Sequence, residues 1–239
     1  MMNIEKTAQE NFESLKNNVY PGRGIVQGLS KDGKKLVQIY WIMGRSENSR
    51  NRVFIEENGF VRTAPFDESK MKDPSLIIYY PVRFLDKCHI VSNGDQTDTV
   101  YEGLKNGKGF TESLATRQFE PDAPNFTPRI TGMIDLDDKQ HKFHFSILRC
   151  TYGDGKACER MNFAYEAIEP GYGYCVHTYE GDGNPLPTFA RYPYHVPLFD
   201  DNLETYWSIL NAENLVSLLV KTIDVETGKT EIKIKNAHE

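Results

Sequence analysis

Residues 37–52, "VQIYWIMGRSENSRNR", join the two features that decide the fold and point to a function. The first part is an apolar run rich in β-branched and aromatic residues, which is typical of a buried β-strand. After Gly44 the chain becomes polar and carries Arg45, Arg50 and Arg52. Guanidinium groups in a loop at a strand end can bind a phosphate or a carboxylate with two hydrogen bonds. Each arginine taken alone, however, is better explained by pairing with one of the many surface carboxylates.

The composition predicts a folded chain that binds a small anion. The chain has 239 residues, of which 39% are hydrophobic and 26% are charged, so it can bury a core without disulfides. We expect one domain over residues 1–239, with residues 1–18 as an N-terminal helical extension. The net charge of −6 disfavours a nucleic-acid scaffold. Local basic loops in an acidic chain indicate a small anionic ligand instead.

The cysteines and the N-terminus predict a reducing compartment. The four cysteines are widely spaced and form no CxxC pair, which fits neither a metal knuckle nor a disulfide framework; they are Cys88, Cys150, Cys158 and Cys175. The start of the chain is polar and unlike a secretory signal. No segment approaches the ~20 apolar residues of a membrane span. We therefore expect a soluble, cytoplasmic protein that binds no membrane.

Hydrophobic periodicity predicts an α+β fold with many strands and few helices. The helices are expected at residues 4–17, 98–118 and 202–220, of which the last has the clearest apolar stripe. A first hairpin is expected to turn in "KDGKK", a second at Asn58-Gly59 and a third at Thr227-Gly228. The other strands are expected at residues 74–86, 88–94, 130–136, 142–150, 162–170 and 171–179, with a proline-rich loop before residue 130.

Residues 91–98, "VSNGDQTD", form a second constellation of polar groups. Asn93-Gly94 makes a tight turn after a strand, and Asp95, Gln96 and Asp98 follow it. Such a turn exposes backbone donors and acceptors at the rim of a sheet, where they can read the edge of a heterocycle. A plain hairpin turn explains the Asn-Gly pair equally well.

Two further loops carry groups suited to acid–base chemistry. In "FEPDAPNFTPRI", residues 119–130, the carboxyl of Glu120 follows an apolar ring that could raise its pKa, although a solvated acidic loop is the plain alternative. His177 and Tyr179 lie at a predicted strand end, where a histidine is more often structural than catalytic. Arg23 and Arg129 also lie at predicted strand ends. If these ends converge, they form a cradle for a phosphate.

The runs "PGRG", "GRSENSRNR", "DPSLIIYYPVR", "VSNGDQTD", "FEPDAPNFTPRI" and "HTYEG" occur in this order over about residues 20–181. In order and spacing they resemble the archaeal-type IMP cyclohydrolase family. The resemblance implies a four-layer αββα sandwich like that of the N-terminal nucleophile hydrolases. The N-terminal nucleophile itself is absent, because the chain opens with a polar helix, so amide hydrolysis of that type is not expected.

The reaction that the resemblance implies is the last step of purine synthesis, which needs no cofactor or metal. The carboxamide nitrogen of a 5-formamidoimidazole-4-carboxamide ribonucleotide attacks its own formyl carbon, and loss of water gives IMP. Glu120 is the candidate general base, Tyr79 the candidate donor to the formyl oxygen, and Arg23 a candidate catalytic cation. The candidate contacts to a purine mononucleotide are Arg45, Ser46, Asn93, Gly94, Asp98, Arg129, His177 and Tyr179. A homo-oligomer is possible.

The sequence also departs from the family pattern. Tyr80-Pro81 stands where the family usually has Asn-Cys, and neither the N-terminal helix nor the part beyond about residue 185 aligns. Two alternatives therefore stay open. One is a related enzyme that acts on another phosphorylated heterocycle, and the other is a purine-nucleotide-binding protein without catalysis.

Overall fold

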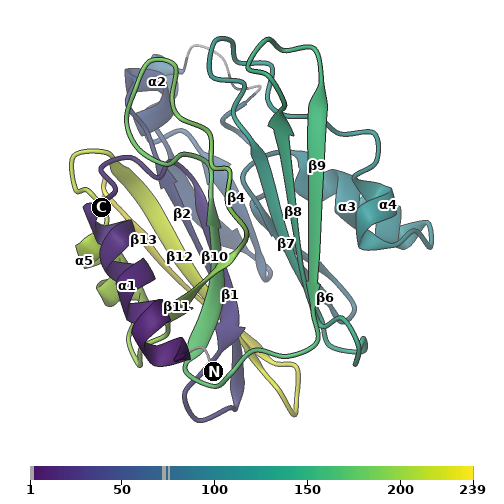
Figure 1. Ribbon diagram of the computed structural model, residues 1–239. Coiled ribbons are helices and arrows are strands. Elements are labelled where there is room, and N and C mark those ends of the chain that lie inside the picture. The colour runs from purple at the N-terminus through teal and green to yellow at the C-terminus, as the bar shows by residue number, and fades with distance from the viewer. Residues whose placement is uncertain (1–2, 72–73, 75, 239) are drawn as a thin grey trace.

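Two antiparallel β-sheets face each other in the computed structural model, which describes residues 3–71, 74 and 76–238 (Figure 1). Helices lie on the outer side of each sheet, so the layers run helix, sheet, sheet, helix. This architecture is α+β, as the periodicity predicts. Residues 1–2 of the predicted N-terminal extension and Ser75 of the predicted strand 74–86 lie outside the described residues.

Each sheet is antiparallel throughout. The first sheet has the order β11-β10-β1-β2-β12-β13, with the bounds Tyr194–Pro197, Tyr172–His177, Gly24–Leu29, Lys35–Met43, Leu215–Asp224 and Thr230–Asn236. The second has the order β3-β4-β5-β6-β7-β8-β9, with the bounds Val53–Glu57, Phe60–Ala64, Val82–Leu85, Cys88–Ser92, Arg129–Asp135, Phe143–Cys150 and Cys158–Tyr165. The three predicted hairpins are confirmed as β1–β2, β3–β4 and β12–β13.

The position of strand β2 explains why residues 37–43 are apolar almost without interruption. Every residue of β2 after Lys35 is buried. Side chains alternate along a strand, so Ile39 and Trp41 pack in the cluster under the helices, whereas Tyr40 and Ile42 pack between the two sheets. Because both faces of this strand are covered, neither face carries the alternating polar residues of a half-exposed strand.

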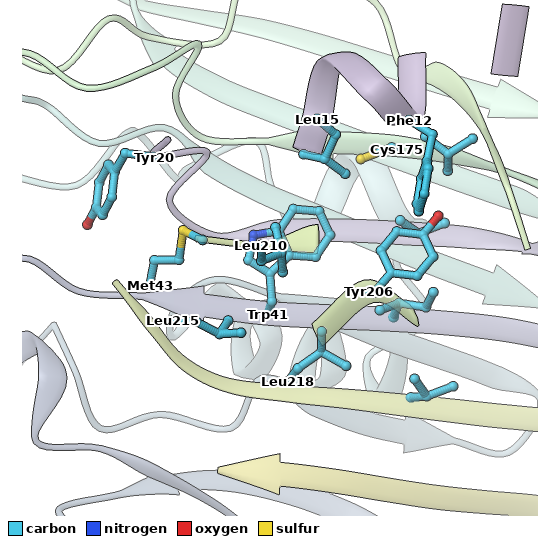
Figure 2. Close-up of a cluster of buried hydrophobic side chains, with 14 of the residues drawn as sticks. Phe12, Leu15, Tyr20, Trp41, Met43, Cys175, Tyr206, Leu210, Leu215 and Leu218 are labelled. Atoms are coloured by element: carbon cyan, nitrogen blue, oxygen red, sulfur yellow. The ribbon is translucent and has the colours of Figure 1, made fainter. Parts of the chain in front are cut away.

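Helix α1, Ile4–Asn17, begins at the N-cap Asn3 and confirms the predicted helix 4–17. Its apolar stripe covers the outer face of the first sheet together with helix α5, Asn202–Ile209. Figure 2 shows Phe12 and Leu15 of α1 directed toward the sheet and toward Tyr206 of α5. The rings of Phe12 and Tyr206 meet edge to face, with centroids 5.5 Å apart.

The predicted helix 98–118 is only partly correct, because the chain forms two shorter helices on the outer face of the second sheet. These are α3, Gln96–Lys105, and α4, Phe110–Ser113. Gly107 lies between them with a φ of 75°, a left-handed conformation that ends α3. Val100 and Phe110 pack against Ile90 and Met133 of the sheet.

The predicted helix 202–220 is wrong beyond Ile209. A turn closed by the Leu215 N–H donating to the Asn211 carbonyl separates α5 from β12, which is a central strand. Leu218 packs under the helices and Leu219 between the sheets. A strand buried on both faces is apolar at most positions, as Leu215, Val216 and Leu218–Val220 are in β12, so it satisfies a helical period as well as a strand period.

The segment 74–86 also contains less strand than predicted. Among its described residues, only Val82–Leu85 form a strand, β5, and Tyr79 lies just before it in an irregular stretch. The short strand β11 and the helical turns α2, Glu47–Arg50, and η1, Glu68–Lys70, were not predicted. The proline-rich loop before β7 is confirmed.

Candidate functional site

A buried ion pair between Arg23 and Glu120 lies at the centre of the candidate site. One terminal nitrogen of Arg23 is 2.7 Å from each carboxylate oxygen of Glu120. The Arg23 side chain is 13% exposed and that of Glu120 is 4% exposed, so the pair is largely removed from water. Arg23 is fixed just before β1 by hydrogen bonds between its backbone and Thr178, and the Glu120 N–H donates to the Thr127 carbonyl.

Burial and charge act in opposite directions on this pair. Burial raises the pKa of the Glu120 carboxyl, while the nearby guanidiniums of Arg23 and Arg129 lower it, and burial prevails. Burial lowers the pKa of Arg23, but the Glu120 carboxylate and three tyrosines raise it well above its ordinary value. Glu120 is therefore a carboxylate held by a permanent cation, with a greater proton affinity than a solvated glutamate has.

Arg129 reaches the same place from the start of β7. Its Nη1 donates to Gln96 Oε1 at 2.7 Å and lies 2.7 Å from the carboxylate of Asp95. A Cβ added to Gly94 would lie 2.5 Å from that Nη1 and 3.6 Å from Glu120 Oε1. The absence of a side chain at Gly94 is thus what admits the Arg129 guanidinium beside Glu120.

Two phenols and a third guanidinium complete the interior of the site. The hydroxyls of Tyr40 and Tyr79 are 2.7 Å apart, and Tyr79 is anchored by backbone hydrogen bonds to Thr63 of β4. Arg52 is 2% exposed, and its Nε donates to the Ser49 carbonyl. Burial raises the pKa of Tyr79, and the guanidiniums of Arg52 and Arg23 oppose that rise.

Two buried aromatic rings, Tyr20 and Tyr179, connect the interior of the site to its rim at Arg45. The Tyr179 hydroxyl bonds that of Thr127, and the Tyr20 ring is stacked on the Tyr179 ring with centroids 5.9 Å apart. The Arg45 guanidinium lies 5.2 Å from the centre of the Tyr20 ring. It also pairs with Asp182 at 2.6 Å, and the Arg45 side chain is 38% exposed. Arg45 is therefore connected to the interior through the two rings and is itself at the surface.

The arginine-rich loop after β2 divides its guanidiniums among three places. Residues 47–50 form the short helix α2, so the loop is ordered by its own hydrogen bonds. Arg50 turns back to donate to the Gly44 carbonyl and to Asn214. Arg45 lies at the rim and Arg52 in the interior, so only two of the three arginines of this loop are directed to the site.

Four other predicted residues are engaged in framework contacts. Ser46 caps α2 by accepting from the Ser49 N–H, and Asp98 pairs with Arg83 at 2.6 Å. The Nδ1 of His177 is 2.9 Å from the Tyr179 carbonyl, and its ring packs among aromatic side chains. The side chain of Asn93 is occupied by hydrogen bonds to the backbone. Its amide donates to the Pro128 carbonyl, and its oxygen accepts from the Ile130 N–H.

Tyr40 and Arg52 are the interior residues that sequence reasoning did not assign to the site. Tyr40 belongs to the apolar run of β2, where an aromatic residue reads as core. Its hydroxyl on the face of β2 that meets the other sheet could have marked it. Arg52 belongs to the basic loop of residues 45–52, but nothing in its spacing separates it from Arg50.

Comparison with known proteins identifies the family of this chain. Residues 20–229 match a family model described as IMP cyclohydrolase-like protein. The chain belongs to this family. The matched range includes every residue of the buried cluster, from Arg23 to Tyr179. It also extends well beyond residue 185, where the motifs themselves give no alignment.

Curated IMP cyclohydrolases from archaea are similar to this chain. The protein from Methanocaldococcus jannaschii is 34% identical over 122 residues, which are 50% of this chain and 59% of the relative. That from Methanopyrus kandleri is 31% identical over 147 residues, 57% of this chain and 72% of the relative. That from Methanosphaera stadtmanae is 28% identical over 169 residues, 68% of this chain and 74% of the relative.

Within the described part of the chain, no helix is long and apolar enough to cross a membrane. Nor do three or more His, Cys, Asp or Glu side chains among these residues gather in a group that could hold a metal ion.

Proposed function

We propose that this member of the family is an IMP cyclohydrolase, which closes the second purine ring of 5-formamidoimidazole-4-carboxamide ribonucleotide. The observation that carries the proposal is the convergence of Arg23, Tyr79, Glu120 and Arg129 in one buried cluster. The names of the archaeal relatives support it. The ligand is then a purine mononucleotide, in keeping with a site that holds more guanidiniums than carboxylates.

Glu120 serves as the general base in the first step. The carboxamide nitrogen is a poor nucleophile, so its proton must leave as the new C–N bond forms. The buried carboxylate accepts that proton, and Arg23 holds the carboxylate in place. Its raised pKa brings its basicity closer to neutral pH, where a general base is most effective.

Tyr79 donates a proton to the formyl oxygen in the same step. Negative charge develops on that oxygen as nitrogen attacks, and a positioned donor stabilises it. Because burial raises the pKa of Tyr79, its phenol keeps its proton at neutral pH. The product of the step is a cyclic carbinolamine, with Glu120 protonated and Tyr79 ionised.

The second step restores both groups. Glu120 returns its proton to the hydroxyl, the C–O bond breaks and water leaves. The ring nitrogen loses a proton to the Tyr79 oxygen as the C=N bond forms. The reaction is intramolecular, so much of the acceleration comes from holding the carboxamide against the formyl group.

The guanidiniums divide the remaining work. Arg129, beside Gly94, contacts the heterocycle or the formyl oxygen, and the stacked Tyr20 and Tyr179 rings lie on the side of the cluster toward Arg45. Arg45, at the rim, is placed to hold the 5′-phosphate outside the buried cluster. Ser46, Asn93, Asp98 and His177 then support these groups through their framework contacts.

The departure at Tyr80-Pro81 leaves the cluster complete. The Tyr80 ring meets the Phe60 ring with centroids 6.4 Å apart and lies 5.5 Å from the Arg83 guanidinium. Tyr80 therefore has different neighbours from Tyr79, whose hydrogen-bond partners are Tyr40 and Thr63. The changed pair therefore gives little support to a different substrate.

The remaining parts of the proposal concern the setting of the enzyme. We propose one domain over residues 1–239, a relation of the sandwich to the N-terminal nucleophile hydrolases, a cytoplasmic location and a possible homo-oligomer. The described structure supports the location through its four free cysteines, which are typical of a reducing compartment.

The experiment is an assay of IMP formation from the formylated ribonucleotide by the purified protein. Glu120→Gln is expected to lower kcat by ~10²-fold or more, as loss of a general base does. Glu57→Gln is the matched control, because Glu57 pairs with Arg62 on the surface. Wild-type protein that binds IMP but forms none from its precursor would contradict the proposal and favour a non-catalytic nucleotide-binding protein.

A further inference from the structure

The hydroxyl of Tyr40 is placed to act on Tyr79 and not on a substrate. Tyr40 lies in the centre of β2 and is 0% exposed, whereas Tyr79 is 6% exposed. The two oxygens are 2.7 Å apart, and either can be the donor. If Tyr40 donates, its proton is consumed within the pair and the Tyr79 proton is free to point outward. Tyr79 can act as a proton donor only when Tyr40 donates to it in this way.

Arg52 adds a positive charge to the surroundings of the same pair. Among the described residues, no carboxylate lies within ion-pair distance of its guanidinium, whereas Arg23 has Glu120 and Arg129 has Asp95. A buried cation without a counter-ion favours negative charge on its neighbours. Arg52 is buried against β2, the strand that carries Tyr40, with its Nη2 donating to the Met43 carbonyl at 3.5 Å. From there its charge acts on Tyr79, Tyr40 and Tyr20, together with Arg23.

We propose that Tyr40 and Arg52 are positioning residues that make Tyr79 a stronger proton donor, Tyr40 by hydrogen bonding to the Tyr79 oxygen and Arg52 by its charge. The inference rests on the proposed function and assigns two residues to its acid step. When Tyr79 gives its proton to the formyl oxygen, the charge left on the phenolate is shared with the Tyr40 hydroxyl and stabilised by Arg52. The same contacts then hold the phenolate until the ring nitrogen returns a proton.

The charged and titratable groups around Tyr79 agree with this assignment. Burial raises the pKa of Tyr79 most, and the Glu120 carboxylate raises it further. Arg52, Arg23 and the hydrogen bond from Tyr40 lower it. Without Tyr40 and Arg52, the phenol would be a weaker acid in the same low-dielectric surroundings.

The test compares Tyr40→Phe with Tyr206→Phe. Tyr206 is equally buried but lies under α1, where its hydroxyl donates to the Pro197 carbonyl, far from the acid step. Losing a hydrogen bond to a developing charge is expected to lower kcat about 10- to 100-fold in Y40F, with KM and IMP affinity changed by less than about twofold. Y206F is expected to keep the wild-type kcat.

A rescue separates acidity from structure. Placing 3-fluorotyrosine, a more acidic phenol, at position 79 is expected to restore part of the kcat that Y40F loses. The alkaline limb of kcat, which reports loss of the Tyr79 proton, should move to lower pH with the fluorinated residue and to higher pH in Y40F. If Y40F lowered kcat only by disturbing the structure, 3-fluorotyrosine at position 79 would not restore kcat, and the alkaline limb would not move to higher pH in Y40F.

A matched pair at Arg52 tests the charge. Arg52→Lys keeps a cation and is expected to retain more kcat than Arg52→Gln, with similar melting temperatures. Equal activity in the two variants would overturn the part assigned to Arg52, and wild-type kcat in Y40F would overturn the part assigned to Tyr40. A wild-type protein without cyclisation would overturn the proposed function and this inference together, whereas an active wild type with an unaffected Y40F overturns only the inference.

Discussion

Lys221, in the central strand β12, is expected to destabilise the protein, and its replacement by methionine should show by how much. The side chain is 0% exposed, and among the described residues its Nζ has no hydrogen-bond partner. It lies 5.2 Å from the centre of the Phe84 ring, which offsets only part of the cost of burying an ammonium group. Methionine has a similar volume and carries no charge.

The pKa of Lys221 sets the size of the effect. Burial lowers this pKa from its ordinary value of 10.5 to about 7. Since one pKa unit corresponds to about 1.4 kcal/mol, this lowering of the pKa costs about 4 kcal/mol at pH 7. The folded-state pKa is the lower one, so the penalty is complete below pH 7 and disappears as pH rises toward the unfolded value. Allowing for the Phe84 contact, Lys221→Met should stabilise the protein by about 2–4 kcal/mol at pH 7.

Chemical denaturation at pH 6, 7 and 9 measures this effect. The gain from Lys221→Met should be largest at pH 6 and smallest at pH 9. Lys233→Met is the control, because Lys233 lies on the adjacent strand β13 with 64% of its side chain exposed. A K221M protein that is less stable than wild type at pH 6, or a gain that does not change with pH, would refute the reasoning.

Two further predictions concern the candidate site and the fold. Gly94→Ala should displace the Arg129 guanidinium, which would be 2.5 Å from the new Cβ, and lower kcat/KM about 10-fold or more, while Gly109→Ala, with open space at its Cβ, should change it little. Unchanged kcat/KM in G94A would mean that Arg129 does not need its present position. Burial lowers the pKa of His177 from 6.5 to about 3, so its contribution to stability is complete above pH 6.5 and is lost as pH falls toward 3. His177→Asn should therefore reduce the acid dependence of the unfolding free energy by up to about 1.4 kcal/mol per pH unit in that range, and an unchanged slope in a denaturation series would contradict the neutral histidine.

Local sequence signals predicted the elements that are determined by residues close together in the sequence. The helix of residues 4–17 and the turn at Asn58-Gly59 follow from periodicity and from residues that accept positive φ, and the structure has both. The error at residues 202–220 arose because β12 is covered on both faces. Burial of that kind depends on the neighbouring layers, which no window of sequence contains.

The candidate site divides in a similar way. Motif order was enough to name Arg23, Tyr79, Glu120 and Arg129, which the structure brings together. It could not separate Arg52 from Arg50, since their difference arises from the path of the loop around α2. Nor could it show that the amide of Asn93 is occupied by backbone groups of Pro128 and Ile130.

The layering of the molecule has a consequence for how activity is gained and lost. Arg23 lies just before β1 and Tyr40 lies in β2 of the first sheet, whereas Glu120 lies in the loop before β7 of the second sheet and Arg129 begins β7. Neither half of the sandwich alone possesses the proposed reaction centre, so we expect a species in which the sheets have formed but not docked to be inert. Catalytic competence therefore reports closure of the interface between the sheets, and should disappear on partial separation before circular dichroism records any loss of strand.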